Sequence, residues 1–125
     1  MTENEAGTII IDAAVAIHRR TGPGLLESVY EAILVAELRK RGLHVERQAP
    51  VPIAYDGQVF KEGFRADLLV ERKVIVELKS VDRVMPAHRK QVQTYLRLSG
   101  CKLGYLLNFG APLMKSGIFR CANGI

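Results

Sequence analysis

The sequence predicts an α/β or α+β fold in which a mixed sheet of four or five strands is flanked by helices. Two stretches near the N-terminus carry apolar residues at helical spacing. The middle and the end of the chain instead carry short runs rich in valine, isoleucine and leucine. These runs alternate little with polar residues, which is typical of strands buried on both faces. Helices on both sides of one sheet account for all three observations.

Three segments are predicted to be helical. Residues 7–20 and 25–41 carry broad apolar faces, and each ends in a cationic turn that suits the negative end of a helix dipole. Gly42 follows the second segment, where glycine commonly ends a helix. The third helix is expected to begin at Pro86 and to reach Ser99 before Gly100 stops it.

Strands are expected on either side of that third helix. Before it, short extended segments are predicted at residues 43–47, 51–55 and 58–60. Asp56 and Gly57 form a strong two-residue turn signal between the last two of these segments. Pro50 and Pro52 predict an edge strand, because proline cannot donate to a ladder. After the helix, strands are predicted at residues 103–109, which should be central, and at residues 117–121.

The central element of the predicted sheet is a β-hairpin. Two apolar runs, 68–70 and 74–76, flank a polar tripeptide and supply branched residues for paired strands. A turn centred on Arg72 would place Asp67 opposite Glu77. The tripeptide offers no glycine or asparagine for a left-handed position, and a slip of one residue would turn the two acids to opposite faces.

That register makes Asp67, Glu77 and Lys79 candidate catalytic residues. Opposed side chains in an antiparallel pair have Cβ atoms about 5 Å apart, so two carboxylates there repel. A divalent cation between them reverses the sign of the interaction, and hard oxygen ligands suit Mg²⁺ or Mn²⁺. The ammonium of Lys79, on the same face as Glu77, would orient a metal-bound water or stabilise charge on a phosphate. The simpler alternative is three solvated residues at the rim of a strand pair.

Three further residues are candidates for the same site. Glu27 lies in the first turn of the second predicted helix, where it either complements the helix dipole or reaches the carboxylate pair as an additional metal or water ligand. Gln91 and Tyr95 share one face of the third predicted helix. They either lie at the boundary of the core or contact a phosphate or metal-bound waters. The basic residues of that helix are either solvated or attract a nucleic-acid backbone.

Length and composition set further expectations. The chain has 125 residues, so we expect one domain over residues 1–125. Its 18 Lys and Arg against 13 Asp and Glu give a net charge of +5, which suits a polyanionic partner such as nucleic acid. Cys101 and Cys121 lack the spacing of a zinc knuckle or a disulfide scaffold. No signal peptide or membrane span is recognisable, so a cytoplasmic location without membrane association is expected.

Three motifs in order carry a resemblance to a known family. Residues 24–30 spell G-x-x-E-x-x-Y, residues 63–67 read GFRAD and lead to ELK at 77–79, and residues 88–95 contain Q-x-x-x-Y. The chain thereby resembles the GxxExxY family, which belongs with the PD-(D/E)xK nuclease-like superfamily. The resemblance covers nearly the whole chain. One departure is that Ala66, rather than proline, precedes Asp67.

The resemblance implies a restriction-endonuclease-like core in which Asp67 and Glu77 bind Mg²⁺ and Lys79 assists. It also implies that Glu27, on the first core helix, supports the metal. A Q-x-x-x-Y signature after E-x-K is similar to that of recombination-type nucleases, and it falls here on Gln91 and Tyr95. These are the residues that the pairing argument and the helix faces had already indicated.

The leading hypothesis is a nuclease that uses Mg²⁺ or Mn²⁺ to hydrolyse phosphodiester bonds in DNA or RNA. An alternative is a non-catalytic module that keeps the fold and binds nucleic acid or a protein. A third hypothesis is a toxin-like or defence component that acts only in an assembly. Because a chain of this length carries no separate DNA-reading domain, target recognition would require a homodimer or a partner protein.

Overall fold

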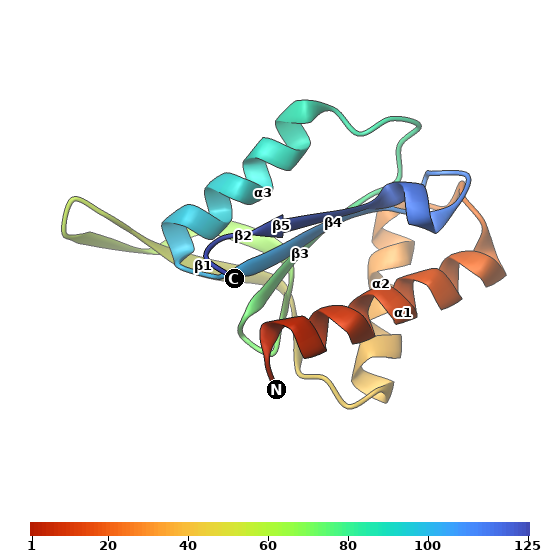
Figure 1. Cartoon of the computed structure of the whole chain (residues 1–125), viewed down its shortest axis with the longest axis horizontal. Helices are drawn as coiled ribbons and strands as arrows, with labels where there is room; N and C mark the ends of the chain where they lie inside the picture. Colours follow the sequence, from red (N-terminus) through yellow and green to blue (C-terminus); the bar gives the residue numbers. More distant parts are fainter.

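The computed structural model describes all 125 residues and has a five-stranded sheet with helices on both faces (Figure 1). In chain order the elements are α1 (Glu3–Thr21), α2 (Glu27–Lys40), β1 (Val45–Tyr55), β2 (Gln58–Val70), β3 (Val74–Lys79), α3 (Pro86–Ser99), β4 (Leu103–Asn108), the 3₁₀ helix η1 (Met114–Gly117) and β5 (Ile118–Ala122). The strands lie in sequence order, and only β3 and β4 are parallel. The predicted α/β class with a mixed sheet is confirmed.

The parallel pair explains why α3 stands apart from the other helices. Parallel neighbours need a crossover connection, and α3 supplies it by crossing one face of the sheet between β3 and β4. The helices α1 and α2 cover the opposite face (Figure 1). The internal strand β4 is buried at every residue, as the apolar sequence there predicted. None of the three helices has the length and apolar character needed to cross a membrane.

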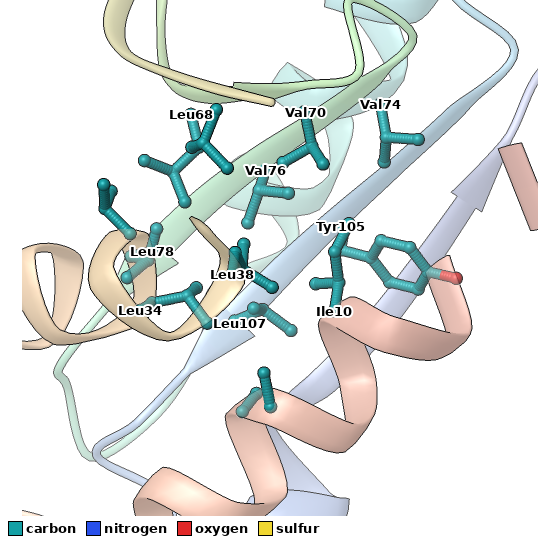
Figure 2. Packing of buried hydrophobic residues seen from close by; sticks show 14 of the residues in the cluster. Ile10, Leu34, Leu38, Leu68, Val70, Val74, Val76, Leu78, Tyr105 and Leu107 are labelled. Carbon is teal, nitrogen blue, oxygen red and sulfur yellow. The ribbon is translucent and has the colours of Figure 1, made fainter. Parts of the chain in front are cut away.

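The larger part of the core lies between the sheet and the first two helices. Figure 2 shows Ile10 of α1 and Leu34 and Leu38 of α2 close to Val76 and Leu107 of the sheet. All five side chains are excluded from solvent. A smaller apolar group lies under α3. Burial on both faces explains why the strand sequences lack a polar alternation.

The beginning of α1 and the bounds of the first two strands differ from the predicted ones. The helix α1 begins four residues before the predicted start because Thr2 and Glu5 form a capping box. The backbone N–H of Glu5 donates to Oγ1 of Thr2 at 3.1 Å, and the N–H of Thr2 donates to Oε1 of Glu5 at 2.9 Å. The predicted short strands before residue 60 are instead the continuous strand β1 and the first part of β2.

The hairpin of β1 and β2 extends beyond the helices as an arm (Figure 1). Its tip is the predicted turn at Asp56 and Gly57, with φ of 51° and 75°. The edge position that the prolines predicted for β1 is confirmed. Tyr55 and Val59, next to the tip, are mostly exposed.

The turn between β2 and β3 takes a left-handed conformation without glycine. The predicted register is confirmed, because Leu68 pairs with Val76 and Val70 with Val74. Glu71 and Arg72 both have a φ of 53°. Contacts with the chain before β1 and with β1 itself compensate, since the Glu71 carboxylate accepts from the N–H of His44 at 2.7 Å and Arg72 pairs with Glu46 at 3.1 Å.

The connection from α1 to α2 is held by Tyr30, the last residue of the G-x-x-E-x-x-Y motif. Its ring is fully buried and stacks on Phe109 with centroids 4.6 Å apart. Its hydroxyl donates to the carbonyl of Gly22 at 2.5 Å and accepts from the N–H of Leu25 at 3.2 Å. Tyr30 thereby fixes the loop that leads into Glu27.

We predict that Tyr30→Phe lowers the free energy of unfolding by about 1–3 kcal/mol, because the Gly22 carbonyl and the Leu25 N–H lose their partner. Urea unfolding followed by circular dichroism measures the change. The matched control is Tyr55→Phe on the arm, where the side chain is 70% exposed and the expected change is below about 0.5 kcal/mol. Equal losses in the two variants would contradict the structural role of the Tyr30 hydroxyl.

Candidate active site

The candidate site begins where the backbone pairing of β2 and β3 ends. The last paired residues on this side are Leu68 and Val76. Beyond them, the N–H of Asp67 donates to Oε2 of Glu77 at 2.8 Å, and the N–H of Leu78 donates to Oδ2 of Asp67 at 2.9 Å. Each carboxylate therefore accepts from a backbone N–H of the other strand, as a backbone carbonyl would in a regular ladder. The structure brings together the two acids that the hairpin register had placed opposite each other.

The residues of the site lie toward both helical layers. In β3, Val76 and Leu78 belong to the core under α1 and α2, so Glu77 and Lys79, which alternate with them, lie on the α3 side of the sheet. The alternation is interrupted at Asp67, because Ala66 packs under α3 whereas Leu68 packs under α1 and α2, and the Asp67 side chain lines a pocket with residues of α2. Lys79 is half-buried and forms no ion pair, and its positive charge acts to lower the pKa of Glu77. The ammonium is thus near the carboxylate pair without contacting it.

Burial and repulsion together shape the electrostatics of the pair. Glu77 is only 8% exposed. Its pKa is raised to about 8, first by burial and then by the charge of Asp67, against the lowering effect of the Asp67 N–H. No Lys, Arg or His nitrogen lies within 4.0 Å of either carboxylate. Burial and the charge of Asp67 thus both favour the protonated carboxyl of Glu77, and a cation that neutralised the pair would oppose them.

The donor set of this pair fits a hard divalent cation. Oε1 of Glu77 accepts no hydrogen bond, and Oδ1 of Asp67 has only a long contact of 3.4 Å with Nε2 of Gln48. One oxygen of each carboxylate is therefore available, and oxygen is the donor that Mg²⁺ and Mn²⁺ prefer. No group of three Asp, Glu, His or Cys side chains converges closely enough to hold a metal ion. Glu27 does not join the pair in such a cluster.

Glu27 lies across a pocket from Asp67. The pocket has a volume of about 410 Å³, and both side chains line it. Glu27 is the first residue of α2 and is exposed. Its pKa is raised, chiefly by partial burial and also by the charge of Asp67, while Lys79 acts in the opposite direction. The three charged groups therefore act on one another across the pocket, with Glu27 at its rim.

Sequence reasoning missed a polar network that supports Asp67. Glu31, one turn after Glu27 in α2, is 7% exposed and pairs with Arg47 at 2.9 Å. Its other oxygen accepts from Nε2 of Gln48 at 2.8 Å, and the same amide nitrogen lies 3.4 Å from Asp67. A charged residue within the apolar face of a predicted helix was the one available signal.

Gln48, whose amide contacts Glu31 and Asp67, has an unusual backbone conformation. It lies in β1 between residues that pair with the two neighbours of Asp67, and is therefore opposite Asp67. Its φ is 46°, in the left-handed region that a side-chain-bearing residue rarely occupies. Strained residues of this kind persist where the surrounding contacts determine them, and here these contacts are the hydrogen bonds of its amide.

The two candidates on α3 differ in position. Tyr95 stacks on Phe64 of β2 with ring centroids 3.7 Å apart. The pKa of Tyr95 is raised, first by burial and then by the charges of Glu77 and Asp67, so its phenol is close to the carboxylate pair. Gln91, one turn earlier, is exposed, and its side chain makes no hydrogen bond to the rest of the chain. The structure brings Tyr95 to the site and leaves Gln91 at the surface of α3.

Comparison with known proteins identifies the family. A family model described as the PD-(D/E)XK nuclease superfamily matches residues 4–121. No match was found among curated proteins or among solved structures. The narrower GxxExxY assignment stays a prediction. The match covers the carboxylate pair, Lys79, the pocket and all three helices, and the chain therefore belongs to the PD-(D/E)XK nuclease superfamily.

Proposed function

We propose that the protein is a metal-dependent nuclease that hydrolyses phosphodiester bonds in DNA or RNA. The observation that carries the proposal is the buried pair of Asp67 and Glu77, which are tied to each other's strands and each keep one oxygen available. The superfamily to which the chain belongs consists of nucleases, and such enzymes generally use divalent metals.

Asp67 and Glu77 would hold Mg²⁺ or Mn²⁺, which supplies an activated water and neutralises charge on the phosphate. Lys79 would orient that water and balance the negative charge that builds up in the transition state. Glu27 would bind a water across the pocket, because it stands at the rim. The Tyr95 phenol would donate to a phosphate oxygen, and Gln91 would contact the substrate farther out on α3.

Gln48 has a positioning role in this proposal. Its amide bridges Glu31 and Asp67, and Arg47 neutralises Glu31 from the other side. The bridge limits the orientations of the Asp67 carboxylate, which a metal ligand requires. Glu31 itself is occupied by Arg47 and Gln48, so it supports the site without serving as a ligand.

We expect Asp67→Asn and Lys79→Gln each to lower metal-dependent cleavage at least about a hundredfold, because one removes a ligand charge and the other a transition-state cation. Cleavage of fluorescent DNA and RNA in Mg²⁺ or Mn²⁺ measures the rates. Asp56→Asn, in an exposed turn that asparagine tolerates, and Lys61→Gln on the exposed arm make the same chemical changes away from the site. Cleavage that survives both site changes would refute the assignment.

The raised pKa of Glu77 predicts a specific pH dependence. The folded protein binds a proton at Glu77 up to a pKa of about 8, whereas the unfolded chain releases it near the ordinary value of 4.5. Since the folded state binds more protons between these values, the stability of the metal-free protein should fall as the pH rises from about 4.5 to about 8. Urea unfolding in EDTA at several pH values measures the slope.

In Glu77→Gln this part of the pH dependence should disappear, because no proton is left to release. For the unaltered protein at pH 7, calorimetry in buffers of different ionisation enthalpy should show that Mn²⁺ binding releases a proton. Glu46→Gln, at the beginning of β1 where the side chain pairs with Arg72, should leave both results unchanged. A slope that persists in Glu77→Gln would assign the titration to another group.

Gln48→Gly separates the positioning role from the fold. Glycine accepts a φ of 46° without strain, so the free energy of unfolding should change by less than about 1 kcal/mol. Loss of the amide should weaken Mn²⁺ binding and cleavage about tenfold. Calorimetric titration and cleavage rates measure these effects, with Gln58→Gly on the arm as the control. Unchanged Mn²⁺ affinity would show that Gln48 does not position Asp67.

A further inference from the structure

A groove of about 430 Å³ runs between the beginning of α3 and β5, on the flank of α3 that faces away from the carboxylate pair. Three of the side chains that line it are cationic and none is acidic. They are Arg83, Arg89 and Lys90. None of the three forms an ion pair. The groove therefore concentrates positive charge that no carboxylate of the chain neutralises.

Many arginines elsewhere in the chain form ion pairs. Those at positions 41, 47, 65 and 72 each pair with a glutamate at 3.1 Å or less. In the groove, by contrast, Arg89 lies over the ring of Phe119, 4.8 Å from its centroid. A cation over an aromatic ring keeps its charge and its donors for a further partner.

The floor of the groove is held in place by contacts between α3 and β5. The side-chain amide of Gln93 donates to the carbonyl of Ala122 at 2.9 Å, and Arg89 packs on Phe119. Arg83 and Lys90 stand exposed beside this floor. Fixed cations around a rigid floor suit a ligand that offers several negative charges in succession, as a nucleic-acid backbone does.

The groove and the carboxylate pair lie on the two flanks of one helix. Tyr95 faces the carboxylates, whereas Arg89 and Gln93 face β5. Residues 80–85 lead directly from Lys79, at the end of β3, to the beginning of α3, and Arg83 belongs to this connection. A backbone that crosses the beginning of α3 would therefore contact both the groove and the region of Lys79.

We propose that this groove binds the phosphate backbone of the nucleic acid beside the bond that is cleaved. The inference rests on the proposed function and adds the path of the substrate to it. Nucleic acid is favoured over an acidic protein because regularly spaced phosphates match several guanidinium and ammonium groups, and because the chain belongs to a superfamily of nucleases. The phosphate contacts would hold the strand in register without reading its sequence.

The test compares two triple variants that both change the net charge from +5 to +2. The groove variant is Arg83→Gln, Arg89→Gln and Lys90→Gln. The control variant is Arg19→Gln, Arg20→Gln and Lys40→Gln, which removes exposed cations without ion pairs from α1 and α2. Fluorescence anisotropy in EDTA then measures the affinity of each protein for a short DNA duplex at several salt concentrations, without cleavage.

The groove variant should bind at least about tenfold more weakly than the unaltered protein, and its salt dependence should fall by about 0.9 for each lost phosphate contact. The control variant should bind within about threefold of the unaltered protein. A second groove variant that keeps the charges, Arg83→Lys and Arg89→Lys, should retain most of the affinity. Thermal unfolding of all variants shows whether each one folds.

Equal weakening in the groove and control variants, or none in the groove variant, would overturn the inference. So would a folded protein that binds no duplex at all. A failure of the proposed function gives a different result from a failure of the groove. If the unaltered protein binds DNA through the groove but cleaves neither DNA nor RNA, then the binding role of the groove is supported and the nuclease assignment is wrong. If it cleaves, and the groove variant binds and cleaves equally well, only the groove is wrong.

Discussion

The two hydrogen bonds that tie the carboxylates of Asp67 and Glu77 to backbone N–H groups of each other's strands are the constraint on which the site depends. Where β2 and β3 part, backbone donors lose their ladder partners, and a buried donor must find another acceptor. The N–H groups of Asp67 and Leu78 find it in the two carboxylates. This arrangement holds the acids in place and forces two negative charges together at a poorly solvated position. The raised pKa of Glu77 follows from the same geometry.

The other elements place charged and polar groups around this pair. Tyr30 holds the loop before α2 and so sets where Glu27 begins the helix. From the edge strand β1, Gln48 connects Asp67 to Glu31. The pocket is therefore built by three elements that are distant in sequence, while the carboxylate pair itself comes from one hairpin.

The topology explains why α3 divides the surface into two regions. Because β3 and β4 are parallel, the connection between them must cross a face of the sheet, and it crosses the face that bears Glu77. One flank of α3 consequently brings Tyr95 to the site. The other flank meets β5 and forms the basic groove with Arg89. A single crossover helix thus positions a chemical site and a charged surface side by side.

Patterns within short segments determined much of the fold. Branched apolar runs predicted the register of the central hairpin, and prolines predicted the edge strand, because side-chain alternation and the missing proline N–H act locally. The opposition of Asp67 and Glu77 followed from that register. Only the tertiary structure decided that Tyr95 approaches the pair while Gln91 stays exposed, that Glu27 stands at the rim, and that Gln48 takes a left-handed backbone. These outcomes depend on how segments distant in sequence pack together, and no local period encodes that packing.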